Sequence, residues 1–101
     1  MSGRFADEED APGGEAARRR RARYRAWHRG IKEMDLVLGP FADRHVDTFS
    51  RQGLAEFERL LDCADQDIYD WLTGRKAAPE GQADELLDAV RRSAFGDAGA
   101  P

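Results

Sequence analysis

Apolar residues recur in this chain at the spacing of an α-helix, and this pattern restricts the fold to the all-α class. No segment shows sustained alternation of apolar and polar residues, and no internal repeat is present. A length of 101 residues favours a single domain with a modest core. We therefore expect a small five-helix bundle at residues 15–95. The segments 1–14 and 96–101, rich in Gly, Ala, Pro and acidic residues, are expected to be disordered tails.

The helices are bounded by residues that favour helix ends. Ser50 and Asp65 are predicted N-caps, and Gly74 is a predicted C-terminal stop. Gly39-Pro40 predicts a kink or a break in the second helix. The helices are expected at 16–29, from 31 to about 46, after the Ser50 cap, between the Asp65 cap and Gly74, and at 83–95. The buried faces are expected to contain Tyr24, Trp27, Ile31, Met34, Leu38, Phe41, Leu54, Phe57, Leu60, Leu61, Ile68, Trp71, Leu72, Leu86, Leu87 and Val90.

Several functional classes lack support in this sequence. No apolar run approaches the roughly 20 residues of a membrane-spanning helix, and the acidic start lacks the apolar stretch of a signal peptide. A single cysteine, Cys63, is consistent with a reducing compartment, so a cytoplasmic protein is expected. His28, His45 and Cys63 do not have the spacing of a metal site. With no nucleophile or phosphate-binding motif, we expect no enzymatic activity and no firmly bound cofactor.

The charge of the chain is unevenly distributed. The net charge is −4, yet the first expected helix carries the basic run Arg18–Arg25 on an otherwise acidic chain. This run could neutralise the phosphates of a nucleic acid, with Tyr24 and Trp27 stacking on bases. Alternatively, it forms a solvated basic helix that pairs with acidic residues of the body or of a protein partner. The second interpretation is favoured because the chain as a whole is acidic, so binding to nucleic acid is not expected.

A glycine joins the basic segment to the next apolar one. Glycine destabilises a helix interior by about 1 kcal/mol relative to alanine. Gly30 is therefore expected to mark either a tight turn or a place where another backbone comes close. If one helix ran through Gly30, Arg29 and Glu33 could form a weak intrahelical pair. If Gly30 ends the first helix, Arg29, Lys32 and Glu33 would present a mixed-charge patch around the glycine.

The order and spacing of several blocks resemble a known family, the bacterial FAD assembly factor of succinate dehydrogenase and its mitochondrial counterpart, succinate dehydrogenase assembly factor 2. The resemblance spans roughly residues 24–90, and the acidic start and the long arginine run depart from it. The Arg-Gly-x-x-Glu motif alone is a weak signal, whereas its spacing to the other blocks is fairly specific. The matching blocks are Arg29–Asp35, Gly39–Phe41, Phe57–Asp62 and Asp65–Leu72.

This resemblance implies a function. Members of the family bind the flavoprotein subunit of succinate dehydrogenase or fumarate reductase and promote covalent attachment of FAD, which is the cofactor of that client. The motif falls here on Arg29, Gly30 and Glu33. Other family blocks include Asp35, Pro40, Phe41 and Trp71, which are expected to be partly structural. With Lys32, the expected partner-binding residues are Arg29, Gly30, Lys32, Glu33, Asp35, Pro40 and Phe41. An antitoxin-like regulatory protein and the nucleic-acid-binding module remain alternatives.

Overall fold

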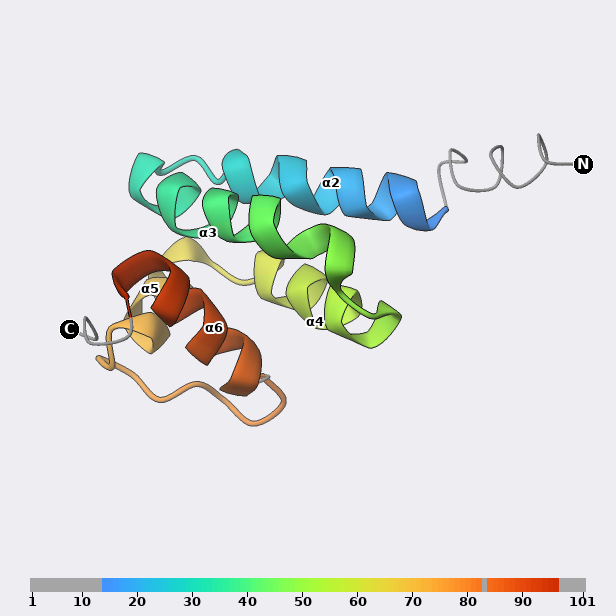
Figure 1. The fold of residues 1–101 in the computed structure, drawn as a ribbon. Helices are drawn as coiled ribbons and strands as arrows, with labels where there is room; N and C mark the ends of the chain where they lie inside the picture. Colours follow the sequence, from blue (N-terminus) through green and yellow to red (C-terminus); the bar gives the residue numbers. More distant parts are fainter. Residues whose placement is uncertain (1–13, 83, 97–101) are drawn as a thin grey trace, which may run out of the picture.

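Five α-helices and one short 3-10 helix form the fold in the computed structural model, which describes residues 14–82 and 84–96 (Figure 1). In chain order they are α2 (Glu15–Trp27), α3 (Lys32–His45), η1 (Val46–Thr48), α4 (Arg51–Leu61), α5 (Asp65–Leu72) and α6 (Asp84–Phe95). The part of the chain that the structure describes contains no strand, and the predicted all-α bundle of five helices is confirmed. Apart from Gly14 and Gly96, the two predicted tails lie outside the described residues.

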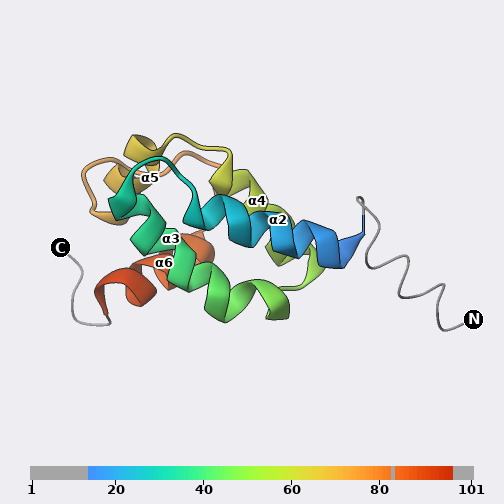
Figure 2. The same cartoon turned by 90° about the horizontal axis from the view of Figure 1, so that it is seen from above.

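Helix α3 lies at the centre of the bundle. It packs against α2 on one side and against α6 on the other, while α4 also packs against α2 (Figures 1 and 2). Phe41 of α3 contacts Phe57 and Phe49, with ring centroids 5.6 Å and 6.0 Å away. Burying each such side chain stabilises the fold by roughly 1.5–3 kcal/mol. Most of the predicted apolar stripe is buried: Met34, Leu38, Phe41, Leu54, Phe57, Leu60, Leu61, Ile68, Leu72, Leu86, Leu87 and Val90.

The predicted helix-end signals are confirmed at Ser50 and Gly74 and are wrong at Asp65. The Ser50 hydroxyl accepts a hydrogen bond from the Gly53 N–H at 3.0 Å, which confirms the predicted N-cap of α4. Gly74 follows α5 with a φ of +79°, as expected of a C-terminal stop. The prediction for Asp65 was wrong, because Ala64 occupies the N-cap of α5 and Asp65 is the first helical residue. The Asp65 carboxylate instead accepts a hydrogen bond from Arg29.

Helix α3 continues through Gly39-Pro40, so the predicted possibility of a break is wrong. A proline inside a helix costs about 3 kcal/mol, because it removes one backbone hydrogen bond and crowds the preceding turn. Leu38, Phe41 and Ala42 flank the proline and are fully or almost fully buried. We infer that their packing holds the helix together across the proline.

Four aromatic or aliphatic side chains are less buried than the helical spacing predicted. Tyr24 is 64% exposed and stacks on His28, and Ile31 is 47% exposed at the N-cap of α3. Trp27 and Trp71 are partly buried. Trp27 lies over α3, with its indole N–H donating to Asp43 at 3.2 Å. Spacing alone could not distinguish these side chains from the core because they lie at its edge.

The contact between Trp27 and α3 depends on Gly39. A Cβ added at Gly39 would lie 2.3 Å from the Trp27 indole, well inside van der Waals contact. We expect Gly39→Ala to lower the free energy of unfolding by about 1–3 kcal/mol, because the overlap outweighs the higher helix propensity of alanine. Thermal or urea unfolding followed by circular dichroism measures this change.

Gly53→Ala is the matched control for this prediction. Gly53 is also helical, but a Cβ there meets nothing closer than the Ser50 Oγ at 3.3 Å. Because the Ser50 hydroxyl needs to shift by only a few tenths of an ångström, Gly53→Ala should change the free energy of unfolding by less than about 1 kcal/mol. Equal stability of the Gly39→Ala variant and the unsubstituted protein would contradict the close packing of Trp27 on Gly39.

Candidate partner-binding site

The segment between α2 and α3 makes a tight turn around Gly30. Helix α2 ends at Trp27, α3 begins at Lys32, and Gly30 has a φ of +101°, a conformation that side-chain-bearing residues rarely adopt. This geometry excludes one continuous helix through residues 29–33, but α2 ends at Trp27, earlier than the expected end at Gly30. Gly30 is exposed, and a Cβ built there meets no atom within 4 Å.

Arg29 connects this turn to the junction of α4 and α5. Its Nε donates to Asp65 Oδ1 at 2.7 Å, and its two terminal nitrogens donate to the carbonyls of Leu61 at 2.6 Å and Cys63 at 2.8 Å. The Arg29 side chain is 9% exposed and that of Asp65 is 13% exposed. Charge-assisted hydrogen bonds in such a mostly buried place are stronger than neutral ones. Arg29 therefore holds the α2–α3 turn against the α4–α5 junction.

Asp35 fixes the same turn from the other side. Its Oδ1 accepts a hydrogen bond from the backbone N–H of Arg29 at 2.6 Å, and it lies in the first turn of α3, where a carboxylate interacts favourably with the helix dipole. Two carboxylates thus hold Arg29 in the turn: Asp35 accepts from its backbone N–H, and Asp65 accepts from its side chain. The expectation that Arg29 is presented at the surface beside Lys32 and Glu33 is corrected, because its guanidinium is turned into the protein.

Gly30, Lys32 and Glu33 are exposed together around the turn. In the described ranges, the Glu33 carboxylate forms no hydrogen bond or ion pair with another side chain. Phe41, also expected to contact a partner, is 1% exposed in the core, so its side chain is not accessible and that expectation is corrected. Pro40 is half-buried on the same helix. Among the expected residues, the exposed group is therefore Gly30, Lys32 and Glu33.

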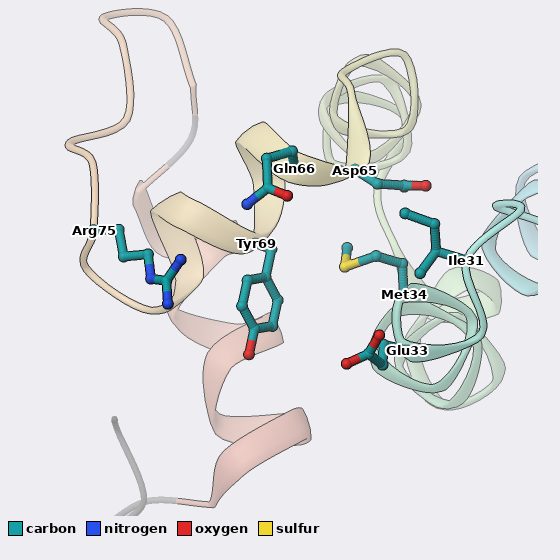
Figure 3. Close-up of a pocket in the computed structure, with 7 residues that line it drawn as sticks. All are labelled: Ile31, Glu33, Met34, Asp65, Gln66, Tyr69 and Arg75. Atoms are coloured by element: carbon teal, nitrogen blue, oxygen red, sulfur yellow. The ribbon is translucent and has the colours of Figure 1, made fainter.

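A groove of about 230 Å³ opens beside this exposed group, between the start of α3 and α5. Figure 3 shows the side chains of the two walls facing one another, with Tyr69 between Arg75 on one side and Glu33 and Met34 on the other. Asp65 at the rim is engaged by Arg29. The lining residues are Ile31, Glu33, Met34, Asp65, Gln66, Tyr69 and Arg75.

The sequence motifs did not reveal the contribution of α5 to this groove. Gln66 and Tyr69 are three residues apart and so lie on one face of α5, but nothing local places that face opposite Glu33. The contact is made by Arg29, which brings the α2–α3 turn to the start of α5. The spacing of Gln66 and Tyr69 was therefore the one signal available, and it did not identify the facing element.

The basic run of α2 pairs with acidic residues of the body. Two Arg18 nitrogens donate to the Glu58 carboxylate at 2.5 Å and 3.2 Å, and the hydrogen bonds that Glu58 accepts raise the pKa of Arg18 above its usual value. Arg23 pairs with Asp43 and Asp47. Arg25 pairs with Asp62 at 2.5 Å. These contacts match the interpretation of α2 as a basic helix that pairs with acidic residues of the body. Arginines engaged in such pairs are less available to bind the phosphates of a nucleic acid.

The described residues lack a metal-binding cluster and a membrane-spanning helix. No three histidine, cysteine, aspartate or glutamate side chains between 14 and 82 or between 84 and 96 are placed to hold a metal ion. No helix in those ranges is long and apolar enough to cross a membrane. Burial raises the pKa of the Cys63 thiol, which makes the reactive thiolate scarcer. The exposed turn and its groove are therefore the strongest candidate site.

Comparison with known proteins identifies the family. The family model described as "Flavinator of succinate dehydrogenase" matches residues 20–94, which include the Gly30 turn, the groove and nearly all of the helical bundle. The chain belongs to this family. The resemblance found in the sequence motifs is thereby confirmed, as is its extent, since the expected range 24–90 lies inside the matched one. The flavinator family is one of assembly factors rather than of catalysts.

The chain is also similar to several named proteins. The chain is 42% identical over 72 residues to "FAD assembly factor SdhE" of Acetobacter pasteurianus, covering 71% of this chain and 66% of the relative. It is 33% identical over 69 residues to "FAD assembly factor SdhE" of Idiomarina loihiensis, a match that covers 68% of this chain and 76% of the relative. It is 45% identical over 62 residues to "Succinate dehydrogenase assembly factor 2, mitochondrial" of Meyerozyma guilliermondii. This match covers 59% of this chain and 46% of the relative. The match thus spans about half of the mitochondrial relative's length.

Proposed function

We propose that this protein is an assembly factor that binds the flavoprotein subunit of succinate dehydrogenase or fumarate reductase and promotes covalent attachment of FAD to it. Membership of the flavinator family carries this proposal. The relatives named as FAD assembly factor and as succinate dehydrogenase assembly factor support it. The exposed Gly30, Lys32 and Glu33 are the residues that we assign to contact the client.

The proposed mechanism assigns the chemistry to the client. FAD and a histidine of the flavoprotein subunit are the reactants, and the factor favours the client conformation in which the two are correctly placed. Gly30 lacks a side chain and permits close approach of the client backbone. Glu33, which lacks a partner in the described part of the chain, is available for a charge-assisted hydrogen bond. Arg29 acts indirectly by holding the turn in place.

We also propose which protein holds the FAD cofactor and in which compartment the factor acts. FAD belongs to the client, and the factor itself holds no cofactor firmly and catalyses no reaction. The groove of about 230 Å³ is smaller than the roughly 300–1,000 Å³ of typical small-molecule pockets. We propose the cytoplasm as the site of action, in agreement with the single cysteine of the sequence.

Complementation tests this function in cells. A bacterial host that lacks its own FAD assembly factor would express this chain together with the flavoprotein subunit from the same source. The expected result is restored covalent flavin on that subunit, seen as fluorescence on a denaturing gel. Unlabelled subunit in the presence of the expressed, helical factor would contradict the proposal.

The two alternatives lack a comparable observation. No feature of residues 14–82 and 84–96 specifically favours an antitoxin-like regulator. The nucleic-acid hypothesis rests on the basic run of α2, where Arg18, Arg23 and Arg25 are paired with acidic residues of the same molecule.

A further inference from the structure

The groove between α3 and α5 has walls of opposite charge. Glu33 lies on the α3 wall, and Arg75 lies on the loop after α5, on the other side of Tyr69 (Figure 3). Both residues are exposed. Within residues 14–82 and 84–96 neither charged group has a side-chain partner, whereas Asp65 at the same rim is neutralised by Arg29 at 2.7 Å.

The floor of the groove is apolar. Met34 is 2% exposed there, and the Tyr69 ring and the exposed Ile31 border it. The volume of about 230 Å³ suits a few side chains of a peptide better than a dinucleotide cofactor. An apolar floor between a carboxylate and a guanidinium therefore fits a protein segment that places an apolar side chain between a basic and an acidic one.

We propose that this groove is a specificity-determining docking site for one segment of the flavoprotein subunit. A basic side chain of the segment pairs with Glu33, a carboxylate of the segment pairs with Arg75, and an apolar side chain between them contacts Met34 and Tyr69. The inference rests on the proposed function, because the groove begins at the same turn that presents Gly30. It adds Arg75 and Tyr69, on a different part of the chain, to the client-binding surface.

Charge reversal at the two walls tests the docking. The apo flavoprotein subunit is titrated with the full-length protein, and the dissociation constant is measured for the unsubstituted chain, Glu33→Lys and Arg75→Glu. Each reversal replaces an attraction with a repulsion, so we expect each to weaken binding by about tenfold or more. Both positions are exposed, so circular dichroism should show unchanged folding.

Arg44→Glu is the matched control. Arg44 is exposed near the end of α3, about 17 Å along the helix from Glu33 at 1.5 Å per residue. This variant makes the same charge change as Arg75→Glu but lies away from the groove, so its binding should stay within about twofold of the unsubstituted chain. A folded Arg75→Glu variant that binds as tightly as the unsubstituted chain overturns the docking proposal and leaves the proposed function intact.

Cross-linking identifies the segment itself. A photo-reactive amino acid placed at the exposed Gln66, on the rim of the groove, is cross-linked to the apo subunit, and the attached peptide is read by mass spectrometry. The expected peptide contains a basic and an acidic residue flanking an apolar one. A cross-linked peptide without a basic residue overturns the proposal. Failure of the unsubstituted chain to bind the subunit at all overturns both the docking and the proposed function.

Discussion

Replacing Arg29 with alanine is expected to lower the free energy of unfolding by about 3 kcal/mol, the largest stability effect that the structure predicts. The substitution leaves the 13% exposed Asp65 carboxylate without its ion pair and the carbonyls of Leu61 and Cys63 without their donors. Breaking a buried pair by removing one partner typically costs 3–5 kcal/mol. Because the site is slightly open to solvent, the lower end of that range applies. Urea unfolding followed by circular dichroism measures the change.

Arg25→Ala provides the comparison for this prediction. Arg25 also pairs with an aspartate at the end of α4, but its side chain and that of Asp62 are 40% and 69% exposed. Exposed pairs contribute about 0–1 kcal/mol, so this variant should lose less than about 1 kcal/mol. Equal, small losses for both variants would contradict the role of Arg29 as an internal anchor of the turn.

Gly30→Arg is expected to reduce client flavinylation to the level seen without any factor, the largest functional effect. The substituted residue must adopt a φ near +101°, which costs of order 1–3 kcal/mol of stability. The side chain itself has room, because no atom lies within 4 Å of a Cβ built there, so the bundle should stay folded. The new side chain then projects into the space that we assign to the client backbone. Covalent flavin fluorescence of the client on a denaturing gel measures the loss.

Gly81→Arg separates this steric effect from backbone strain. Gly81 has a φ of +97° and equally open surroundings, but it lies in the loop between α5 and α6. Both variants should lose similar stability, whereas Gly81→Arg should keep full support of flavinylation. If Gly81→Arg lost flavinylation to the same degree, instability and not blocked contact would explain the result for Gly30→Arg.

The fold was largely predictable because its signals are local. Apolar spacing identified the buried faces of α3 to α6, and the Ser50 cap and the Gly30 turn each depend on residues close in sequence. The errors concern tertiary contacts that local patterns do not report. The Gly39-Pro40 pair indicated a possible break, but packing of the flanking residues keeps α3 whole.

The candidate site was predictable only in part. The motif correctly marked an exposed turn with Gly30 and Glu33, and it did not reveal that Arg29 points inward. That direction is set by Asp65, which is 36 residues away along the chain. The same long-range contact brings Tyr69 opposite Met34 and creates the groove (Figure 3). A single sequence carries the residues for such a contact but no local sign that they meet.

The most direct test of the account is the rate at which the purified apo flavoprotein subunit acquires covalent FAD with and without this protein. The subunit and FAD are mixed, samples are taken over time, and flavin fluorescence on the denatured subunit is measured. The account predicts a faster or more complete labelling with the protein present. Identical time courses, with a helical factor and a subunit that can be labelled, would contradict its central claim.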